Sequence, residues 1–413
     1  MIDTGDTAFV LVSAALVLLM TPALAFFYGG LVRRKNVINT MMMSIVMMAV
    51  CGIMWMLFGY SLSFSGDNGG IIGGLSNVFL GGLPEISEYA DTLPSYAYVG
   101  FQMMFAILTP ALLTGSVAGR MRFKALFFFI ILWSLIVYYP LAHMVWGHGG
   151  LLGEGLGSVD FAGGNVVHIS SGLSGLTLAL LIGRRKGVPR ISYRVHNIPF
   201  VVLGAMLLWF GWLGFNAGSA LGANGLAAHA FMTTNIAASA AMLSWMFIDI
   251  KIQGKPTAVG LSTGAVLGLV AITPGAGFVP IWASLLIGLT ISPIAYFMVS
   301  VIKKKIGYDD ALDAFGCHGV GGIWGGIMVG VFGQSAINPV AQWDGLFFGA
   351  TQLFTAQVLA VIASICVSVV GTFICAKVVG IFTPLRATES EEKIGLDRTL
   401  HGEEAYPAFN GLD

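Results

Sequence analysis

Long runs of apolar residues follow one another along most of the chain. Ala8–Phe27, Val37–Tyr60 and Leu346–Cys375 are each long enough to cross the hydrocarbon core of a membrane, which takes about 20 residues of helix. A transmembrane barrel would show short segments of alternating apolar and polar residues instead. The pattern therefore predicts an all-α, multi-pass protein of the cell membrane, either an inner or a plasma membrane.

The basic residues predict the number and the direction of the spans. All 20 lysines and arginines fall in six groups, at 33–35, 120–124, 184–194, 251–255, 303–305 and 377–398. The segments between groups are mostly apolar, and each fits two spans joined by a loop. With one span before the first group, the total is eleven. By the positive-inside rule the six groups are cytoplasmic, so the N-terminus lies outside and the C-terminus inside.

The eleven helices are expected at positions that follow from these runs: 7–28, 37–61, 96–117, 125–144, 164–182, 198–217, 226–248, 257–273, 279–301, 311–332 and 345–376. The domain organisation is then a transmembrane domain over 1–380 and a cytoplasmic tail over 381–413. The outer loop 62–94 is acidic and holds no basic residue. This loop either is simply solvated or mildly attracts cations.

Composition supports the membrane assignment. Hydrophobic residues make up 56% of the chain and charged residues 10%, whereas soluble proteins carry about 25% charged residues. The 56 glycines fit closely approaching membrane helices. Net charge is zero, which gives no support for nucleic-acid binding. The four cysteines lack metal-ligand spacing and are interpreted as small buried hydrophobes.

An internal repeat links the two halves of the chain. Asp160 precedes His168 by eight residues, Asp310 precedes His318 by eight, and the two pairs are 150 residues apart. Five spans separate them, and this odd number turns the second copy upside down relative to the first. Inverted five-helix repeats, here about 7–182 and 198–332 with a final helix at 345–376, place a transport site near the membrane midplane.

His168 and His318 are the only ionisable residues that we place well inside the spans. An ionisable residue within a membrane indicates function, although a neutral histidine bound to a backbone carbonyl is the alternative. Repeat-related helices bring the two together near the pseudo-twofold axis, and histidine exchanges protons near neutral pH. No further ligand accompanies them at a metal-binding spacing, so neither a metal nor another cofactor is expected.

Five segments, in order along the chain, resemble motifs of the ammonium transporter (Amt/Mep/Rh) family: 101–106, 143–147, 160–168, 211–219 and 313–322. The resemblance runs from about residue 7 to residue 407. It implies selective ammonium uptake by a homotrimer with one pore per subunit. It also implies that the chain is not an enzyme, and no nucleotide loop, activated nucleophile or catalytic carboxylate pair is visible in the sequence.

The resemblance implies individual roles. Trp146, Phe105 and Ser219 form an outer site that recruits ammonium or its analogue methylammonium. Phe105 and Phe215 stack as a gate below it. The lining of the pore and the carboxylates that orient the site complete the set: His168, His318 and Trp212 in the lumen, and Asp160, Asp310 and Asp313 as structural residues.

The chemistry of these residue types fits those roles. Aromatic rings attract a small cation by about 0.5–2 kcal/mol, and a hydroxyl accepts a hydrogen bond from ammonium. A bare cation is costly to desolvate in a dry pore, whereas ammonia is not, and an imidazole can accept the proton. Any one aromatic residue alone would be read as core packing. The interpretation depends on their arrival together and in order.

The tail resembles the regulatory cytoplasmic tail of the family, which docks on the inner loops and takes part in regulation by PII-type proteins. The residues concerned are Gly395, Leu396, Asp397, His401, Gly402 and Tyr406. A tail that only solvates the C-terminus is the alternative. Two other functions stay open: an ammonium sensor built on the same fold, and an Rh-like channel for neutral gas.

Overall fold

The computed structural model describes residues 1–186 and 195–406. Within them, eleven helices are long and apolar enough to cross a membrane, which matches the predicted number. The predicted topology rested partly on basic residues in 187–194, which lie outside the described residues.

The first half of the chain contains five spans. They are α1 (Thr4–Leu31), α2 (Val37–Met54) continuing through a π-helical turn into α3 (Tyr60–Phe64), α4 (Ser95–Val117), α5 (Phe123–Trp133) continuing into α6 (Tyr139–Trp146), and a π-helical segment (Gly164–Ile169) continuing into α7 (Ser170–Ile182). The loop before α4 carries a short antiparallel hairpin of β1 (Ile86–Ser87) and β2 (Ala90–Pro94).

The second half contains six spans and the tail. They are α8 (Ile198–Gly218), α9 (Gly225–Gln253), α10 (Ala258–Ile272), α11 (Ile281–Phe297) continuing into α12 (Lys303–Ile306), a π-helical segment (Phe315–Gly319) continuing into α13 (Val320–Phe332), and α14 (Gln352–Phe382). The tail forms α15 (Glu389–Ile394) and a π-helical turn (Asp397–His401).

The differences from the predicted helix boundaries that matter most are in three spans. The tenth span begins at Phe315 rather than 311, because Asp313 has a φ of 57°, which an α-helix does not accommodate. The eleventh runs over Gln352–Phe382 rather than 345–376, since Gly349, with a φ of 91°, ends a short turn before it. The tail therefore begins after Phe382. The seventh span extends to Gln253 and so includes Asp249.

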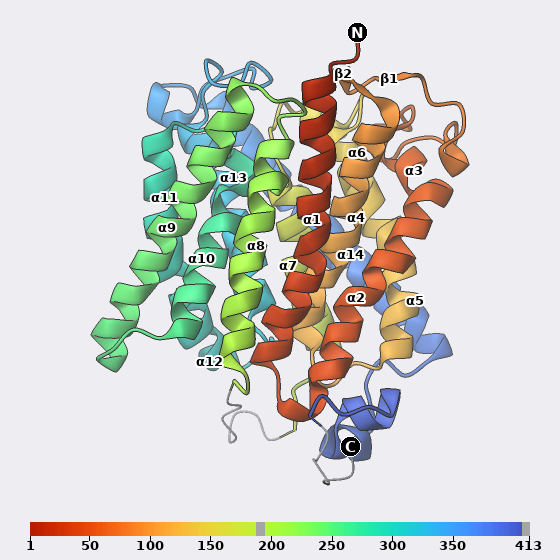
Figure 1. Ribbon diagram of the computed structural model, residues 1–413, viewed down its shortest axis with the longest axis vertical. Coiled ribbons are helices and arrows are strands. Elements are labelled where there is room, and N and C mark those ends of the chain that lie inside the picture. Colours follow the sequence, from red (N-terminus) through yellow and green to blue (C-terminus); the bar gives the residue numbers. More distant parts are fainter. Residues whose placement is uncertain (187–194, 407–413) are drawn as a thin grey trace.

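The two repeats meet where their first helices pack. Helix α1 lies along α8 in the middle of the molecule (Figure 1). A methyl group on Gly204 of α8 would overlap the backbone of Phe27 in α1, so only glycine allows this approach. Close backbone contact is the usual way in which membrane helices associate, because lipid supplies no hydrophobic drive between them.

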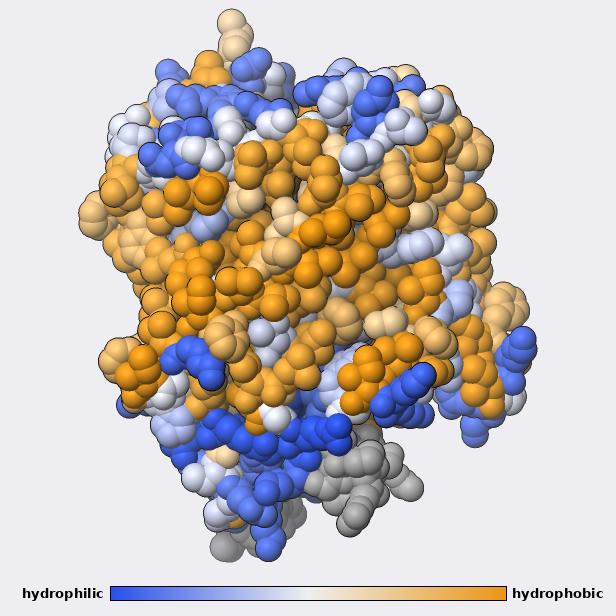
Figure 2. All heavy atoms as spheres, turned by 180° about the vertical axis from the view of Figure 1, so that it is seen from behind, coloured by the Kyte–Doolittle hydropathy of each residue, from blue (hydrophilic) through white to orange (hydrophobic). Residues whose placement is uncertain are grey.

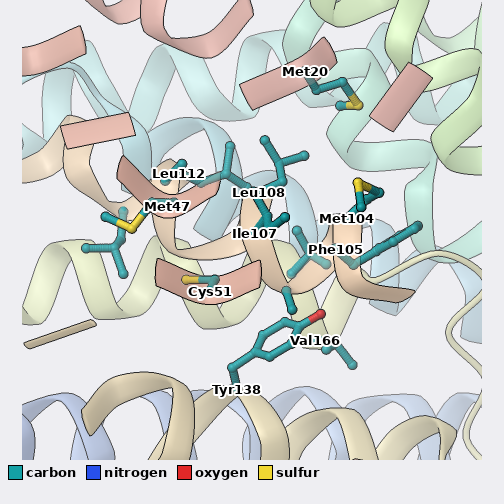
Figure 3. Packing of buried hydrophobic residues seen from close by; sticks show 14 of the residues in the cluster. Met20, Met47, Cys51, Met104, Phe105, Ile107, Leu108, Leu112, Tyr138 and Val166 are labelled. Carbon is teal, nitrogen blue, oxygen red and sulfur yellow. The ribbon is translucent and has the colours of Figure 1, made fainter. Parts of the chain in front are cut away.

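The surface has an apolar belt between two polar ends (Figure 2). We call one end the basic end. It carries the described members of the six basic groups and the tail, while the N-terminus lies at the opposite end (Figure 1). Inside the molecule, residues of α4 pack with methionines of neighbouring helices in a continuous core that includes Phe105 (Figure 3).

Candidate transport site

Trp146 is the last residue of α6 and lies towards the end opposite the basic end. Its indole Nε1 donates a hydrogen bond to the backbone oxygen of Asp160, at 2.8 Å. Its ring meets Phe105 edge to face, with centroids 6.1 Å apart. The indole is half-buried and borders a cavity of about 260 Å³. The hydrogen bond thus holds a cation-attracting ring at a mouth of the bundle.

Ser219 stands just after the last turn of α8, one helical turn beyond Phe215. Its hydroxyl donates to the backbone oxygen of Phe215, at 2.9 Å. The single hydroxyl proton is therefore engaged, and the remaining lone pairs of the oxygen can act only as acceptors. Such an oxygen suits a ligand that donates hydrogen bonds.

Phe105 and Phe215 lie against each other below this mouth. Their ring centroids are 4.3 Å apart at 34°, and each side chain is at most 1% exposed. Two rings at this distance leave no passage for a hydrated ion. The pair is in a closed arrangement.

His168 and His318 lie beneath the phenylalanine pair on the two π-helical segments. Their rings are stacked, with centroids 5.4 Å apart at 16°. The His168 ring also stacks on Phe215, at 6.0 Å, and on Trp212, at 5.3 Å. Among the described residues, both nitrogens of His168 and Nδ1 of His318 are buried without a hydrogen-bond partner. A polar atom left without a partner in an apolar interior is costly, which points to a ligand that binds there.

The predicted residues thus form one column of rings. Neighbouring centroids from Trp146 through Phe105, Phe215 and His168 to His318 are between 4.3 and 6.1 Å apart. Trp212 stands beside the column, where its Nε1 donates to Thr273 Oγ1 at 2.8 Å.

The three predicted orienting carboxylates differ in their surroundings. Asp160 accepts four backbone N–H groups, from residues 163 to 166, and so caps the helix that carries His168. Asp310 accepts from the backbone N–H groups of residues 314 and 315 at the start of the helix that carries His318. Asp313 lies away from the column, at the basic end, where it forms an ion pair with Lys303 at 2.6 Å.

The tail is bound to the basic end. Asp397 Oδ1 accepts a hydrogen bond from the backbone N–H of Asn39, at 2.8 Å, and so caps α2, whose own N-cap residue Asn36 forms no side-chain cap. Asn36 Oδ1 in turn accepts from the N–H of Leu396, a fully buried residue. His401 lies 3.1 Å from Asn39 Oδ1.

Further tail contacts reach other loops. The Tyr406 hydroxyl accepts from Asn197 Nδ2 at 2.8 Å, and Arg122 donates to Glu391 at 2.9 Å. Gly395 and Gly402 have positive φ, at 123° and 70°, and set the turns around the Asp397–His401 segment. The remaining residues of the tail, 407–413, lie outside the described residues.

A buried ion-pair cluster, which the sequence did not reveal, lies at the basic end. Asp309 accepts three hydrogen bonds from the Arg185 guanidinium, the shortest at 2.6 Å, and lies 3.6 Å from the guanidinium of the fully buried Arg120. Burial raises the pKa of Asp309, but the hydrogen bonds and charges of the two arginines outweigh it and bring the pKa to about 2. Only spatial proximity joins these residues, since nearly 190 positions separate Arg120 from Asp309.

Sequence reasoning also missed two groups within the helices. His143 is fully buried in α6, with Nε2 3.0 Å from Asp67 Oδ1 and Nδ1 3.1 Å from the Ser63 oxygen. Asp249 is buried in α9 and bonded to Thr257. The histidine pair is therefore not the only set of ionisable residues inside the spans, contrary to the prediction. Asp249 was missed because the predicted seventh span ended at residue 248, one residue before it.

Comparisons with known proteins identify the family. The model of the Ammonium Transporter Family matches residues 8–406. An ammonium transporter of Bacillus subtilis (strain 168) is 50% identical over 403 residues, covering 97% of this chain and 98% of that protein. The structure of Saccharomyces cerevisiae Mep2 superposes with a TM-score of 0.88 at 35% identity, over 94% of this chain and 88% of that chain. A sensor Amt protein gives 0.86 at 28% identity, over 95% and 97%.

Three independent features agree: eleven apolar helices, a fold shared with Mep2, and a family match over nearly the whole chain. The chain is a multi-pass integral membrane protein that belongs to the Ammonium Transporter Family, whose members are transporters rather than enzymes.

Proposed function

We propose that this chain takes up ammonium selectively across the cell membrane. Ammonium binds at Trp146, Phe105 and Ser219, loses a proton, and passes as ammonia through the lumen beside His168 and His318. Family membership supports ammonium as the cargo. One observation carries the finer mechanism: a closed phenylalanine pair stands directly above two buried imidazoles with unpartnered nitrogens.

The basic end faces the cytoplasm in this proposal, because positively charged loops are retained there. Trp146 then lies at the outer mouth. An ammonium ion there gains about 0.5–2 kcal/mol from the face of a ring. The lone pairs of Ser219 accept one of its hydrogen bonds, since the hydroxyl proton is already donated to Phe215.

The gate and the lumen separate ammonium from potassium. The two ions resemble each other in size and charge, so rings alone discriminate poorly between them. Ammonium can transfer a proton and continue as neutral ammonia, whereas potassium must enter the apolar column as a bare cation. The cost of removing a charge from water without compensation is large.

The paired imidazoles supply the acceptor that the mechanism needs. A neutral imidazole takes the proton from ammonium at a ring nitrogen, which leaves ammonia and an imidazolium. The second imidazole, stacked at 5.4 Å, offers the next acceptor along the lumen. Asp160 and Asp310 take no part in this step; each caps the helix that holds one histidine.

Two other functions fit the observations less well. An ammonium sensor has the same fold at 28% identity, but the Bacillus subtilis transporter is 50% identical along almost its whole length. A channel for neutral gas has no use for a ring and a hydroxyl that recruit a cation at the mouth. Transport of ammonium accounts for both features.

Assembly and regulation belong to the same proposal. We expect a homotrimer with one pore per subunit, which native mass spectrometry of the detergent-solubilised protein tests directly. The tail, bound to α2 and the basic loops, is the expected contact for a PII-type signalling protein on the cytoplasmic face. No cofactor takes part.

Currents on solid-supported membranes test the proposal. Proteoliposomes with the purified protein are exposed to ammonium, methylammonium and potassium in turn. The proposal expects transient currents with ammonium and methylammonium but not with potassium. If the proton does not cross with the ammonia, it expects uptake of labelled methylammonium without a current. Equal responses to ammonium and potassium, or none to any of the three, would contradict it.

A further inference from the structure

A cavity of about 400 Å³ opens at the basic end of the column, and no step described above uses it. Its walls come from α9, α10, α11 and the segment 311–317. Cys317, the residue before His318, lines it, so the cavity reaches the π-helical segment that carries His318. We call it the exit cavity.

Two aromatic rings face the exit cavity. Trp245 of α9 and Tyr296 of α11 both line it, with ring centroids 5.5 Å apart at 68°. Tyr296 follows Trp146 by 150 residues, the same offset that relates Asp160 to Asp310 and the first histidine to the second. In an inverted repeat, such a position lies at the opposite mouth.

Asp249 supplies the cavity with a buried carboxylate. The residue is 1% exposed, and its oxygens accept from Thr257 Oγ1 at 2.6 Å and from Gln253 Nε2 at 3.1 Å. Both donors are neutral, and within the described residues no ion pair joins Asp249 to a lysine, arginine or histidine. A buried charge without an opposite charge is costly. Asp313 also lines the cavity, but Lys303 already neutralises it.

The backbone is shaped to bring these groups together. Gly260 of α10 lines the cavity, and a Cβ atom there would overlap both Asp249 Oδ2 and Trp245 Nε1. The absence of a side chain at this position allows the carboxylate and the indole to converge on one wall. The carboxylate, two rings and the Thr257 hydroxyl then surround one space.

We propose that the exit cavity is a second ammonium site, at which Asp249, Trp245 and Tyr296 hold the ion that forms as ammonia leaves the lumen. Ammonia takes a proton from hydronium at the mouth, which yields ammonium and water. The rings attract the ion and the carboxylate accepts its hydrogen bonds. This inference rests on the proposed function and gives transport from the cytoplasmic side its own binding step.

Concentration dependence measured separately from each face tests this site. Labelled methylammonium transport is recorded in right-side-out and inverted vesicles, whose orientation is read from protease access to the tail. Asp249→Asn keeps the hydrogen-bond acceptor for Thr257 but removes the charge. It should raise the half-saturating concentration at the basic end by roughly tenfold, the equivalent of one charged hydrogen bond, and change it less than roughly twofold at the other end.

Two further variants complete the test. Tyr296→Leu should raise the same constant by roughly 2- to 30-fold, which keeps the proposal testable if Asp249→Asn does not fold. Asp344→Asn is the matched control, because that carboxylate accepts hydrogen bonds from the neutral N–H and hydroxyl of Ser335 and lies in the loop between α13 and α14, at the opposite end.

Each outcome has one meaning. If the half-saturating methylammonium concentration at the basic end is unchanged in both Asp249→Asn and Tyr296→Leu, and transport from the other face is normal, the exit site is overturned and the proposed function stands. Equal competition by potassium at the basic end would overturn the assignment to ammonium. A wild-type protein that moves no methylammonium in either direction would instead overturn the proposed function.

Discussion

At the scale of single residues, the column has two parts. Residues at its mouth can bind a cation, and the two phenylalanines below them exclude a hydrated ion. Trp146 is half-buried beside a cavity, and Ser219 offers only acceptor lone pairs, so this mouth favours a ligand that is both a cation and a hydrogen-bond donor. Phe105 and Phe215 are buried against each other and offer nothing polar to a hydrated ion.

Removing the Trp146 ring should weaken recruitment. In Trp146→Leu, the half-saturating concentration for methylammonium should rise by roughly 2- to 30-fold, the equivalent of one cation–π contact, and sodium or potassium should compete more strongly. Competition during labelled uptake measures this. Trp282→Leu is the control, since Trp282 is 45% exposed and its ring contacts those of Phe332 and Phe347, away from the column. Equal behaviour of the two variants would remove Trp146 from the binding site.

Residue types and spacing predicted the two histidines, and the family resemblance supplied the aromatic members of the column, but neither predicted the contacts around it. Histidines at repeat-related positions stand out in apolar spans, and the structure brings them to 5.4 Å. Asp313 shares the motif of His318, yet its positive φ turns it away to Lys303. Asp249 has only neutral partners nearby in sequence, Gln253 and Thr257, and the second ring that lines its cavity, Tyr296, comes from another helix, so the sequence did not mark it as part of a site.

At the scale of elements, ion pairs at the basic end fix the loops between helices. Asp309 joins the segment before the tenth span to Arg185 after α7 and to Arg120 after α4. Asp309→Asn leaves a buried arginine without its charge partner and should cost about 3–5 kcal/mol in unfolding free energy. Thermal unfolding in detergent measures the loss.

The pH dependence of this difference has a defined sign. The pKa of Asp309 is about 2 in the folded protein against an ordinary 3.8, so its stabilisation is complete above pH 3.8 and is lost as the pH falls towards 2. The difference in unfolding free energy between wild type and Asp309→Asn should therefore become smaller as the pH falls from 3.8 to 2. Glu389→Gln serves as the control, because its pair with Lys186 is exposed. If the difference in unfolding free energy between wild type and Asp309→Asn did not change with pH, the stabilising role of the Asp309 ion pairs would be refuted.

The tail acts as an external cap for α2. Asp397→Ala removes the acceptor for the Asn39 N–H, which should weaken docking by about 0.5–2 kcal/mol. The tail should then be cut faster by an added protease, and methylammonium uptake should change while the helices stay folded. Glu404→Ala, at an exposed position, is the control. Wild-type cleavage and wild-type uptake in Asp397→Ala would mean that the tail only solvates the C-terminus.

Helices were easier to predict than their ends. Within the described residues, each predicted span corresponds to one membrane-crossing helical segment, because hydropathy and the basic groups act over whole segments. Ends depend on single residues: Gly349 delays the last helix, and α9 continues past its apolar run to Gln253. The cap that the tail gives α2 joins positions some 358 residues apart, which no local pattern reveals.

At the scale of the whole molecule, orientation is the next property to measure. Asn68, in the loop after α3, and Lys305, in α12, are both exposed. Helices α3 and α12 lie towards opposite ends of the molecule (Figure 1). In a background without Cys51, Cys317, Cys366 and Cys375, a cysteine at Asn68 should react with an impermeant thiol reagent added to whole cells, and one at Lys305 should react only after lysis. The reverse pattern would invert the proposed direction of uptake.

The central claim is that the closed, dry column passes ammonia and rejects potassium because only ammonium can give a proton to the imidazoles. Potassium-driven and ammonium-driven currents in one reconstituted preparation of wild type and His168→Asp test it most directly. Wild type should respond to ammonium alone. The variant places a fixed negative charge in the lumen, which lowers the cost of a bare cation, and should respond to potassium as well. A variant as selective as wild type would contradict this account and move discrimination up to Trp146 and the phenylalanine gate.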